Sequence, residues 1–422
     1  MRPTAVITGL GFITSIGNDR AAVTHSLRAL RGGLEPIELL GNPALPVKVA
    51  GTVKEFTVES PSWRDWRYPE RYQLSREKLR SLAPHGVYAV CAVEQALEDA
   101  RLTAGAIGDG ATGLYCASAG SPFLIHHHVR QMHAVRGARG DPMGLVASIA
   151  GTLNFNLAAF YHIRGAVGGF SAACASSSHA LGCALDDIRL GRQERMLVVG
   201  AEDVNAETIL PFAALHALST NPDPASASRP FDRQRDGFVA SGGAVCLILE
   251  EAEAARRRGA PVYAALTGWG QASDGHSVAV SHPEGAGLRA AMRRALADAG
   301  VSPGEIEYVN AHATSTPAGD RSEALALRSV FTDVGARPRI SSTKGLTGHT
   351  LSMSGVMEAA FCSLALREGF IPGNASLVEP DEACAGLDLP RAALDIAPGL
   401  VMNNSSGFGG SNVCHVLRRH PP

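Results

Sequence analysis

The chain has 422 residues, of which 45% are hydrophobic and 18% are charged, a composition typical of globular proteins. This length exceeds the usual size of one hydrophobic core, so we expect two domains or two fused halves. Thirty-eight basic residues against 40 acidic ones give a formal net charge of −2, which gives no overall electrostatic reason to expect nucleic-acid binding.

The first apolar segment, VITGLGFITSIG, is interrupted by Gly and Thr and is followed by no small-residue cleavage site. We interpret it as a buried strand and turn. Its glycines, Gly9, Gly11 and Gly17, lack the spacing of a dinucleotide-binding loop, so a nicotinamide site is rejected. Since no apolar stretch approaches about 18 residues, no membrane span is predicted.

Apolar, β-branched runs alternate with segments of helical periodicity along the chain. The strand-like runs include MLVVGAE and AVCLILEE, and the helical segments include VYAVCAVEQALEDARL and GLRAAMRRALADAG. This alternation predicts α/β architecture with largely buried sheets. Residues 45–82 interrupt it and are interpreted as an irregular surface excursion. The charged run at 250–261 is the best candidate boundary, which gives halves of 1–255 and 256–422.

Histidines cluster at positions 126 to 128, with His133 beyond them. Adjacent residues of a helix point in different directions, and no Asp, Glu or Cys joins these histidines at ligand spacing. We therefore predict a partner-contact or solvent-facing segment and no metal site. The eight cysteines show no CxxC pair, which favours reduced thiols in the cytoplasm.

Cys174, in GGFSAACASSSHALGC, lies between a short apolar stretch and the first turn of an expected helix that ends near Gly191. Unpaired N–H groups and the positive dipole end at a helix start favour thiolate, so we expect a pKa below the usual value of about 8.5. A free cysteine is often only a small buried hydrophobe. The small neighbours of Cys174 nevertheless leave room for a substrate and favour a nucleophile.

Two histidines, His312 in YVNAHATSTPAGD and His349 in SSTKGLTGHTLSMSG, both lie at strand-to-helix transitions. A fold can therefore bring them to Cys174, and Lys344 places a cation near the second. Taken singly, each histidine can also be a structural hydrogen-bonding residue. The glycine-rich loop around Phe408, NNSSGFGGSN, can point N–H groups at a developing oxyanion or can form a simple turn.

In order and spacing, the segments AACASSSHA, NAHATSTPAGDRSEA, STKGLTGHTLSMSG and SSGFGGSN together resemble β-ketoacyl-acyl-carrier-protein synthases. The opening VITGLGFITSIGN and the internal RPFDRQRDGFVASGGA and ASDGHSVA are also similar to that family, so the resemblance spans nearly the whole chain. It is closer to the elongating Cys-His-His types I and II than to initiating type III enzymes or biosynthetic thiolases. The resemblance implies a thiolase fold, in which two pseudo-symmetric α/β halves form αβαβα layers, and a dimer.

The resemblance also implies roles for individual residues. Cys174 would accept the acyl group, His312 and His349 would promote decarboxylation, and Lys344 would support them electrostatically. Phe408 would act as a gate, and its backbone N–H and that of Cys174 would form the oxyanion hole. The remaining implied positions are Thr314 and Thr316, which bind the phosphopantetheine arm, and Glu358, an acidic residue near the lysine.

The implied activity is that of an acyltransferase, a 3-oxoacyl-carrier-protein synthase. An acyl group on Cys174 is condensed with malonyl-acyl-carrier protein as carbon dioxide leaves, in fatty-acid or specialised polyketide or polyene biosynthesis, without a cofactor. The implied partners are an acyl carrier protein and a second chain, in a homodimer or in a heterodimer with a similar chain.

The sequence is also compatible with two other functions. A non-catalytic subunit resembling a chain-length factor is the main alternative, although such subunits generally lack the cysteine. A thiolase would need a second catalytic cysteine, and Cys414 lies just past the glycine loop.

Two segments depart from the family pattern. After His349 the family usually has small residues such as Gly-Ala-Ala, whereas this chain has Ser352, Met353 and Ser354. We expect the methionine to narrow or reshape the acyl channel. The stretch 119–133, expected where the pocket floor meets the dimer partner, also departs, and both differences predict an altered acyl specificity.

Overall fold

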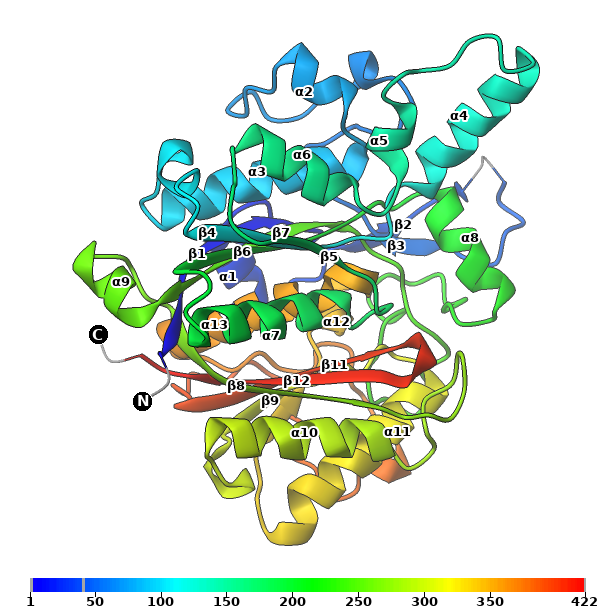
Figure 1. Cartoon of the computed structure of the whole chain (residues 1–422). Coiled ribbons are helices and arrows are strands. Elements are labelled where there is room, and N and C mark those ends of the chain that lie inside the picture. Colours follow the sequence, from blue (N-terminus) through cyan, green and yellow to red (C-terminus); the bar gives the residue numbers. More distant parts are fainter. Residues whose placement is uncertain (1–2, 40–41, 421–422) are drawn as a thin grey trace.

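The computed structural model describes residues 3–39 and 42–420. A ten-stranded mixed sheet runs through the molecule (Figure 1). Its strands are β1 (Ala5–Ile13), β4 (Thr112–Ala117), β5 (Val167–Phe170), β6 (Arg195–Glu202), β7 (Gly243–Glu251), β8 (Ala264–Ser273), β9 (Tyr308–Asn310), β10 (Arg339–Ser341), β11 (Leu400–Gly407) and β12 (Ser411–Arg418). Two short strands, β2 (Leu34–Pro36) and β3 (Val49–Gly51), pair separately.

The large sheet consists of two similar parts joined at β1 and β8. Only three residue pairs join these strands, from Ala5 with Leu266 to Ile7 with Ala264. Outward from this junction the strand orders are β1-β7-β6-β4-β5 and β8-β12-β11-β9-β10. Each part therefore places its first, fifth, fourth, second and third strands in that order, and the two parts lie as separate layers (Figure 1).

Helices cover both layers and fill the space between them. They are α1 (Arg20–Ala29), α2 (Arg76–Arg80), α3 (Pro84–Asp99), α4 (Pro122–Ala134), α5 (Gly144–Ser148), α6 (Thr152–Phe160), α7 (Ser176–Arg189), α8 (Ala206–Ala214), α9 (Ala252–Arg257), α10 (Ala286–Ala299), α11 (Pro317–Val330), α12 (Lys344–Thr347) and α13 (Ser354–Glu368). In Figure 1, α3 and α6 lie outside one layer, α10 and α11 lie outside the other, and α7, α12 and α13 lie between them. This arrangement confirms the predicted α/β class and αβαβα layering.

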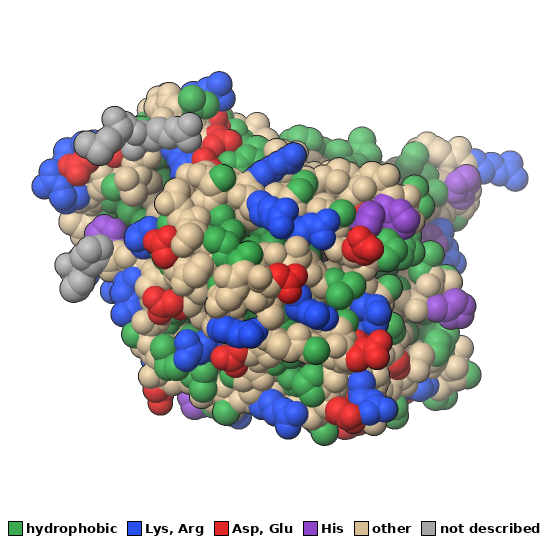
Figure 2. Space-filling model, turned by 90° about the horizontal axis from the view of Figure 1, so that it is seen from below, with side chains coloured by type: hydrophobic (Ala, Val, Ile, Leu, Met, Phe, Trp, Pro, Cys, Tyr) green, Lys and Arg blue, Asp and Glu red, His purple; other side chains and the backbone are tan. Residues whose placement is uncertain are grey.

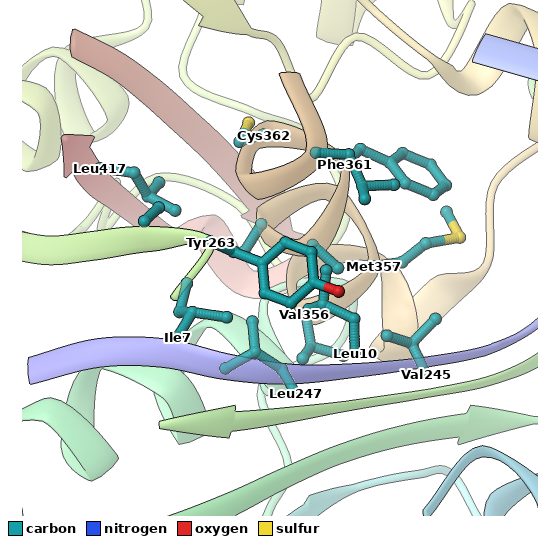
Figure 3. Close-up of a cluster of buried hydrophobic side chains, with 14 of the residues drawn as sticks. Ile7, Leu10, Val245, Leu247, Tyr263, Val356, Met357, Phe361, Cys362 and Leu417 are labelled. Carbon is teal, nitrogen blue, oxygen red and sulfur yellow. The ribbon is translucent and has the colours of Figure 1, made fainter. Parts of the chain in front are cut away.

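The central core lies around α13. Figure 3 shows Val356 of this helix close to Leu10 of β1, and Phe361 and Val245 belong to the same buried cluster. Every residue of α13 from its start to Leu366 is buried, which is typical of a helix enclosed on all sides. Burial of each large apolar side chain contributes about 1.5–3 kcal/mol to folding. The core therefore holds the start of α13 rigidly beside the site described below.

The segment 45–82 is irregular, as expected, but it is not only a surface excursion. Its apolar side chains Phe56, Val58, Trp66 and Tyr72 are buried in one cluster with residues of α3. The prediction was wrong for these side chains because their burial depends on the apolar surface of α3, which lies elsewhere in the sequence.

Neither positive nor negative side chains dominate the face of the molecule seen from below. Figure 2 shows Lys and Arg side chains interspersed with Asp and Glu on the face seen from below, as the small net charge predicts. Within residues 3–39 and 42–420, no helix has the length and apolar character needed to cross a bilayer. The same residues contain no group of three or more His, Cys, Asp or Glu side chains that could hold a metal ion.

Candidate active site

Cys174 lies in a sharp turn between β5 and α7. The preceding Ala173 has a φ of +49°, in the left-handed region where a residue with a Cβ is strained. The end of β11 approaches this turn closely, because a Cβ added to Gly407 would lie 3.1 Å from the Cys174 backbone nitrogen. Only glycine therefore lets the loop that carries Phe408 reach the backbone of the cysteine.

His312 follows β9 and is held through its backbone. The N–H groups of His312 and Ala313 donate to the two carboxylate oxygens of Glu323 in α11, at 3.0 and 2.6 Å. Asn404 of β11 donates to the same carboxylate at 3.1 Å. Glu323 is a site residue that the sequence analysis did not identify, although it lies within the quoted segment NAHATSTPAGDRSEA.

His349 follows α12 and completes the cluster. Gly348 has a φ of +72°, and a Cβ there would lie 2.9 Å from the carbonyl oxygen of Val239, so glycine is required at this turn. The turn directs Nε2 of His349 to the Cys174 sulfur, at 2.9 Å. The His312 ring lies edge-on to the His349 ring, with 5.3 Å between centroids. The structure therefore brings the three predicted side chains together.

A cleft of about 350 Å³ opens above the cysteine. The predicted site residues that line it are Cys174, His312, Thr314, Thr316, His349 and Phe408. The hydroxyl oxygens of the two threonines are 3.1 Å apart, and the Phe408 ring lies edge-on to Phe212. Leu351 also lines the cleft, whereas Met353, expected to shape the acyl channel, is fully buried and packs against Gly200 of β6.

A fully buried ion pair lies behind the histidines, where the Lys344 ammonium donates to the Glu358 carboxylate. Burial raises the pKa of Glu358 to about 7, against the opposing effect of the lysine charge. Burial, followed by the positive charge of Lys344, holds the pKa of both His312 and His349 well below the usual value. Both imidazoles are therefore neutral at physiological pH.

The Cys174 thiol differs from expectation. Burial raises its pKa to about 12, although the Lys344 charge lowers it. The expected lowering of the Cys174 pKa was wrong. The surrounding atoms exclude water from the sulfur, which is only partly accessible, and this desolvation outweighs the stabilisation of the thiolate by the start of the helix. The free site therefore holds a thiol, with Nε2 of His349 placed to take its proton.

Comparison with known families agrees with this geometry. The model described as "Beta-ketoacyl synthase, N-terminal domain" matches residues 3–255, and "Beta-ketoacyl synthase, C-terminal domain" matches residues 263–378. The 3-oxoacyl-[acyl-carrier-protein] synthase 1 of Haemophilus influenzae is 37% identical over 98% of each chain. The enzyme of the same name from Escherichia coli K12 is 38% identical, also over 98% of each chain.

Solved structures agree along the whole chain. A beta-ketoacyl synthase from Burkholderia phymatum STM815 superimposes with a TM-score of 0.90 at 33% identity, over 100% of both chains. The ishigamide ketosynthase/chain length factor gives a TM-score of 0.88 at 31% identity, again over 100% of both chains. On the evidence of fold, site and sequence, the chain belongs to the beta-ketoacyl synthase family.

Proposed function

We propose that this acyltransferase carries an acyl group on Cys174 and condenses it with malonyl-acyl-carrier protein, giving a 3-oxoacyl-carrier protein. The observation that carries the proposal is the 2.9 Å contact between His349 Nε2 and the Cys174 sulfur at the base of the cleft. The second imidazole lies beside this pair. The 3-oxoacyl-[acyl-carrier-protein] synthases similar to this chain support the choice of carrier.

In the first half-reaction, Nε2 of His349 accepts the thiol proton and the Cys174 sulfur attacks the acyl thioester. The backbone N–H groups of Cys174 and Phe408 stabilise the negative oxygen of the tetrahedral intermediate. The intermediate then expels the pantetheine sulfur, which takes the proton back from His349. Thr314 and Thr316 hold the pantetheine arm along the wall of the cleft.

In the second half-reaction, the neutral imidazoles of His312 and His349 donate N–H to the thioester oxygen of malonyl-carrier protein. Carbon dioxide leaves, and its bonding electrons form the enolate that these donors stabilise. The enolate carbon attacks the acyl carbonyl, and the Cys174 sulfur leaves as a thiolate that takes a proton from water. The chain is now two carbons longer. Burial, followed by the positive charge of Lys344, lowers the pKa of both imidazoles and keeps them neutral. These steps need neither a metal nor a redox cofactor.

In this scheme the two halves have separate tasks. The half 1–255 supplies the nucleophile, and the half 256–422 supplies both histidines and Lys344. A non-catalytic role like that of a chain-length factor is not favoured, because Cys174 and both histidines meet in one cleft. The cytoplasm suits the protein, since all eight cysteines are free.

A dimer interface fits the edge of the sheet at β5, the last strand in the order. Large apolar side chains are exposed on and near this edge, at Val167 of β5, Phe155 of α6 and Leu145 of α5. Ile125, Val129 and Met132, spaced four and three residues apart, form an exposed stripe on α4, which supports the partner-contact interpretation of the His126–His128 segment. Light scattering distinguishes a homodimer from a chain that dimerises only with a similar partner, as the name ketosynthase/chain length factor describes for one related structure.

The acyl specificity is tested by offering the purified protein a panel of saturated, polyunsaturated and aryl acyl-carrier proteins and measuring intact mass. We expect an acyl mass gain on Cys174, followed by its loss and formation of a 3-oxoacyl product when malonyl-carrier protein is added. A preference for polyunsaturated or aryl chains indicates specialised biosynthesis, and a preference for saturated chains indicates fatty-acid synthesis. If no chain in the panel gives an adduct or a product, the proposed function is wrong.

The low pKa of the two imidazoles predicts a flat pH profile. A histidine with the ordinary pKa of about 6.5 loses most of its neutral form at about pH 6. Because burial and Lys344 place the pKa of His312 and His349 well below that value, the condensation rate should change little between about pH 8 and pH 6. Initial rates, with circular dichroism as the folding control, test this. A fall in rate with a midpoint near 6.5 contradicts it.

A further inference from the structure

Ser354, the first residue of α13, contacts the catalytic histidine on the side away from the sulfur. Its hydroxyl oxygen lies 3.1 Å from Nδ1 of His349 and 3.1 Å from the hydroxyl oxygen of Thr350. All three residues are at most 2% exposed. Ser354 is the third residue of the segment Ser352–Ser354, where the family resemblance leads us to expect small residues such as Gly-Ala-Ala.

The requirement for such a partner follows from the number of protons on the ring. A neutral imidazole has one N–H, so one ring nitrogen donates and the other accepts. When Nε2 takes the Cys174 proton, Nδ1 must hold its own proton and needs an acceptor. When Nε2 donates to the malonyl thioester, Nδ1 is bare and needs a donor. A buried ring nitrogen without a partner loses the stabilisation that water would give it.

A hydroxyl satisfies both requirements because it can donate or accept, whereas a methyl group satisfies neither. We propose that Ser354 is a positioning residue that hydrogen-bonds Nδ1 of His349 in both half-reactions, with Thr350 orienting its hydroxyl. The inference rests on the proposed function of His349. Between the half-reactions the ring changes tautomer without gaining a net proton. Nε2 takes a proton from water in the cleft, and the Nδ1 proton leaves to water by relay through the hydroxyls of Ser354 and Thr350.

The start of α13 suits this role. The helix is buried on all sides, so Ser354 is held in one place relative to the His349 ring. The Phe238 ring lies edge-on to His349, with 5.2 Å between centroids, and limits movement of the imidazole from another side. Nε2 is therefore directed at the sulfur by contacts on both the ring face and the opposite ring nitrogen.

The test is Ser354→Ala, compared in the wild-type chain and in a His349→Gln chain. In the wild-type background we expect acylation of Cys174 and decarboxylation of malonyl-carrier protein each to slow about tenfold. In the His349→Gln background, where Ser354 has no imidazole nitrogen to contact, the same change should alter either residual rate less than about twofold. Ser363→Ala is the matched control, because this buried serine of α13 donates only to the backbone oxygen of Ala359.

A second readout does not depend on turnover. In protein labelled with 15N-histidine, the Nδ1 resonance of His349, assigned by its absence in His349→Gln, should move in Ser354→Ala and stay in place in Ser363→Ala. Equal losses of rate in both backgrounds, or an unchanged Nδ1 resonance, overturn the inference. If the wild-type chain does not acylate Cys174, the proposed function fails, whereas an active wild type with an equally active Ser354→Ala rejects only the role of Ser354.

Discussion

Replacing Cys174 by Ala should remove the acyl-enzyme and reduce condensation by at least about a thousandfold, because no other group then stores the acyl chain. Intact mass after incubation with acyl-carrier protein should show no gain, and no 3-oxoacyl product should follow. Decarboxylation of malonyl-carrier protein should persist, since His312 and His349 carry out that step. The variant therefore separates the two chemical tasks of the cleft.

A suitable control is Cys183→Ala, which removes a half-buried thiol of α7 that does not line the cleft. This variant should be acylated and should condense as the wild type does. If Cys174→Ala condensed acyl and malonyl carriers at the wild-type rate, the assignment of the nucleophile would be wrong.

The two histidines should show different defects. Among the described residues, His349 is the histidine whose ring nitrogen hydrogen-bonds the Cys174 sulfur. His349→Gln should therefore slow both acylation and decarboxylation, each by about 10²–10⁴-fold. His312→Gln should slow decarboxylation to a similar extent but leave acylation close to the wild-type rate. Rapid-quench mass spectrometry of the acyl-enzyme, together with carbon dioxide release, measures the two steps separately.

This difference follows from the geometry, since the rings lie 5.3 Å apart at a nearly perpendicular angle and Nε2 of His349 lies 2.9 Å from the sulfur. Identical acylation defects in the two variants would show that the 2.9 Å contact does not act as the base. Asn374→Ala, at a buried amide that bonds backbone atoms of Ser342, Ile340 and Pro390, controls for loss of packing. It should lower the melting temperature without separating the two steps.

Much of the fold could be predicted from local patterns. The alternation of apolar runs with helical segments identified α3 and α10, and Gly191, with a φ of +67°, ends the helix that follows Cys174 as expected. The prediction that residues 45–82 form a surface excursion failed for a physical reason. Burial of Trp66 and Tyr72 depends on the surface of α3, which lies elsewhere in the sequence.

Site residues could be predicted where a sequence motif identifies them. They could not be predicted where their role depends on tertiary contacts. Cys174, His312 and His349 stand in distinctive segments, whereas Glu323 became recognisable only when its contacts with the backbone at His312 were visible. Ser354 was identified as a departure from the family pattern, but only the structure links it to His349. The pKa of Cys174 was misjudged for the same reason, because a helix start is a local feature and desolvation by the assembled cleft is not.

The most direct measurement locates the acyl group itself. After a single turnover with acyl-carrier protein in the absence of malonyl-carrier protein, the chain is digested and the peptides are mapped by mass spectrometry. The account predicts the acyl mass on the peptide that contains Cys174, as a thioester that disappears when malonyl-carrier protein is added. An acyl group on a different residue such as Cys414, or an adduct that malonyl-carrier protein leaves unchanged, would contradict it.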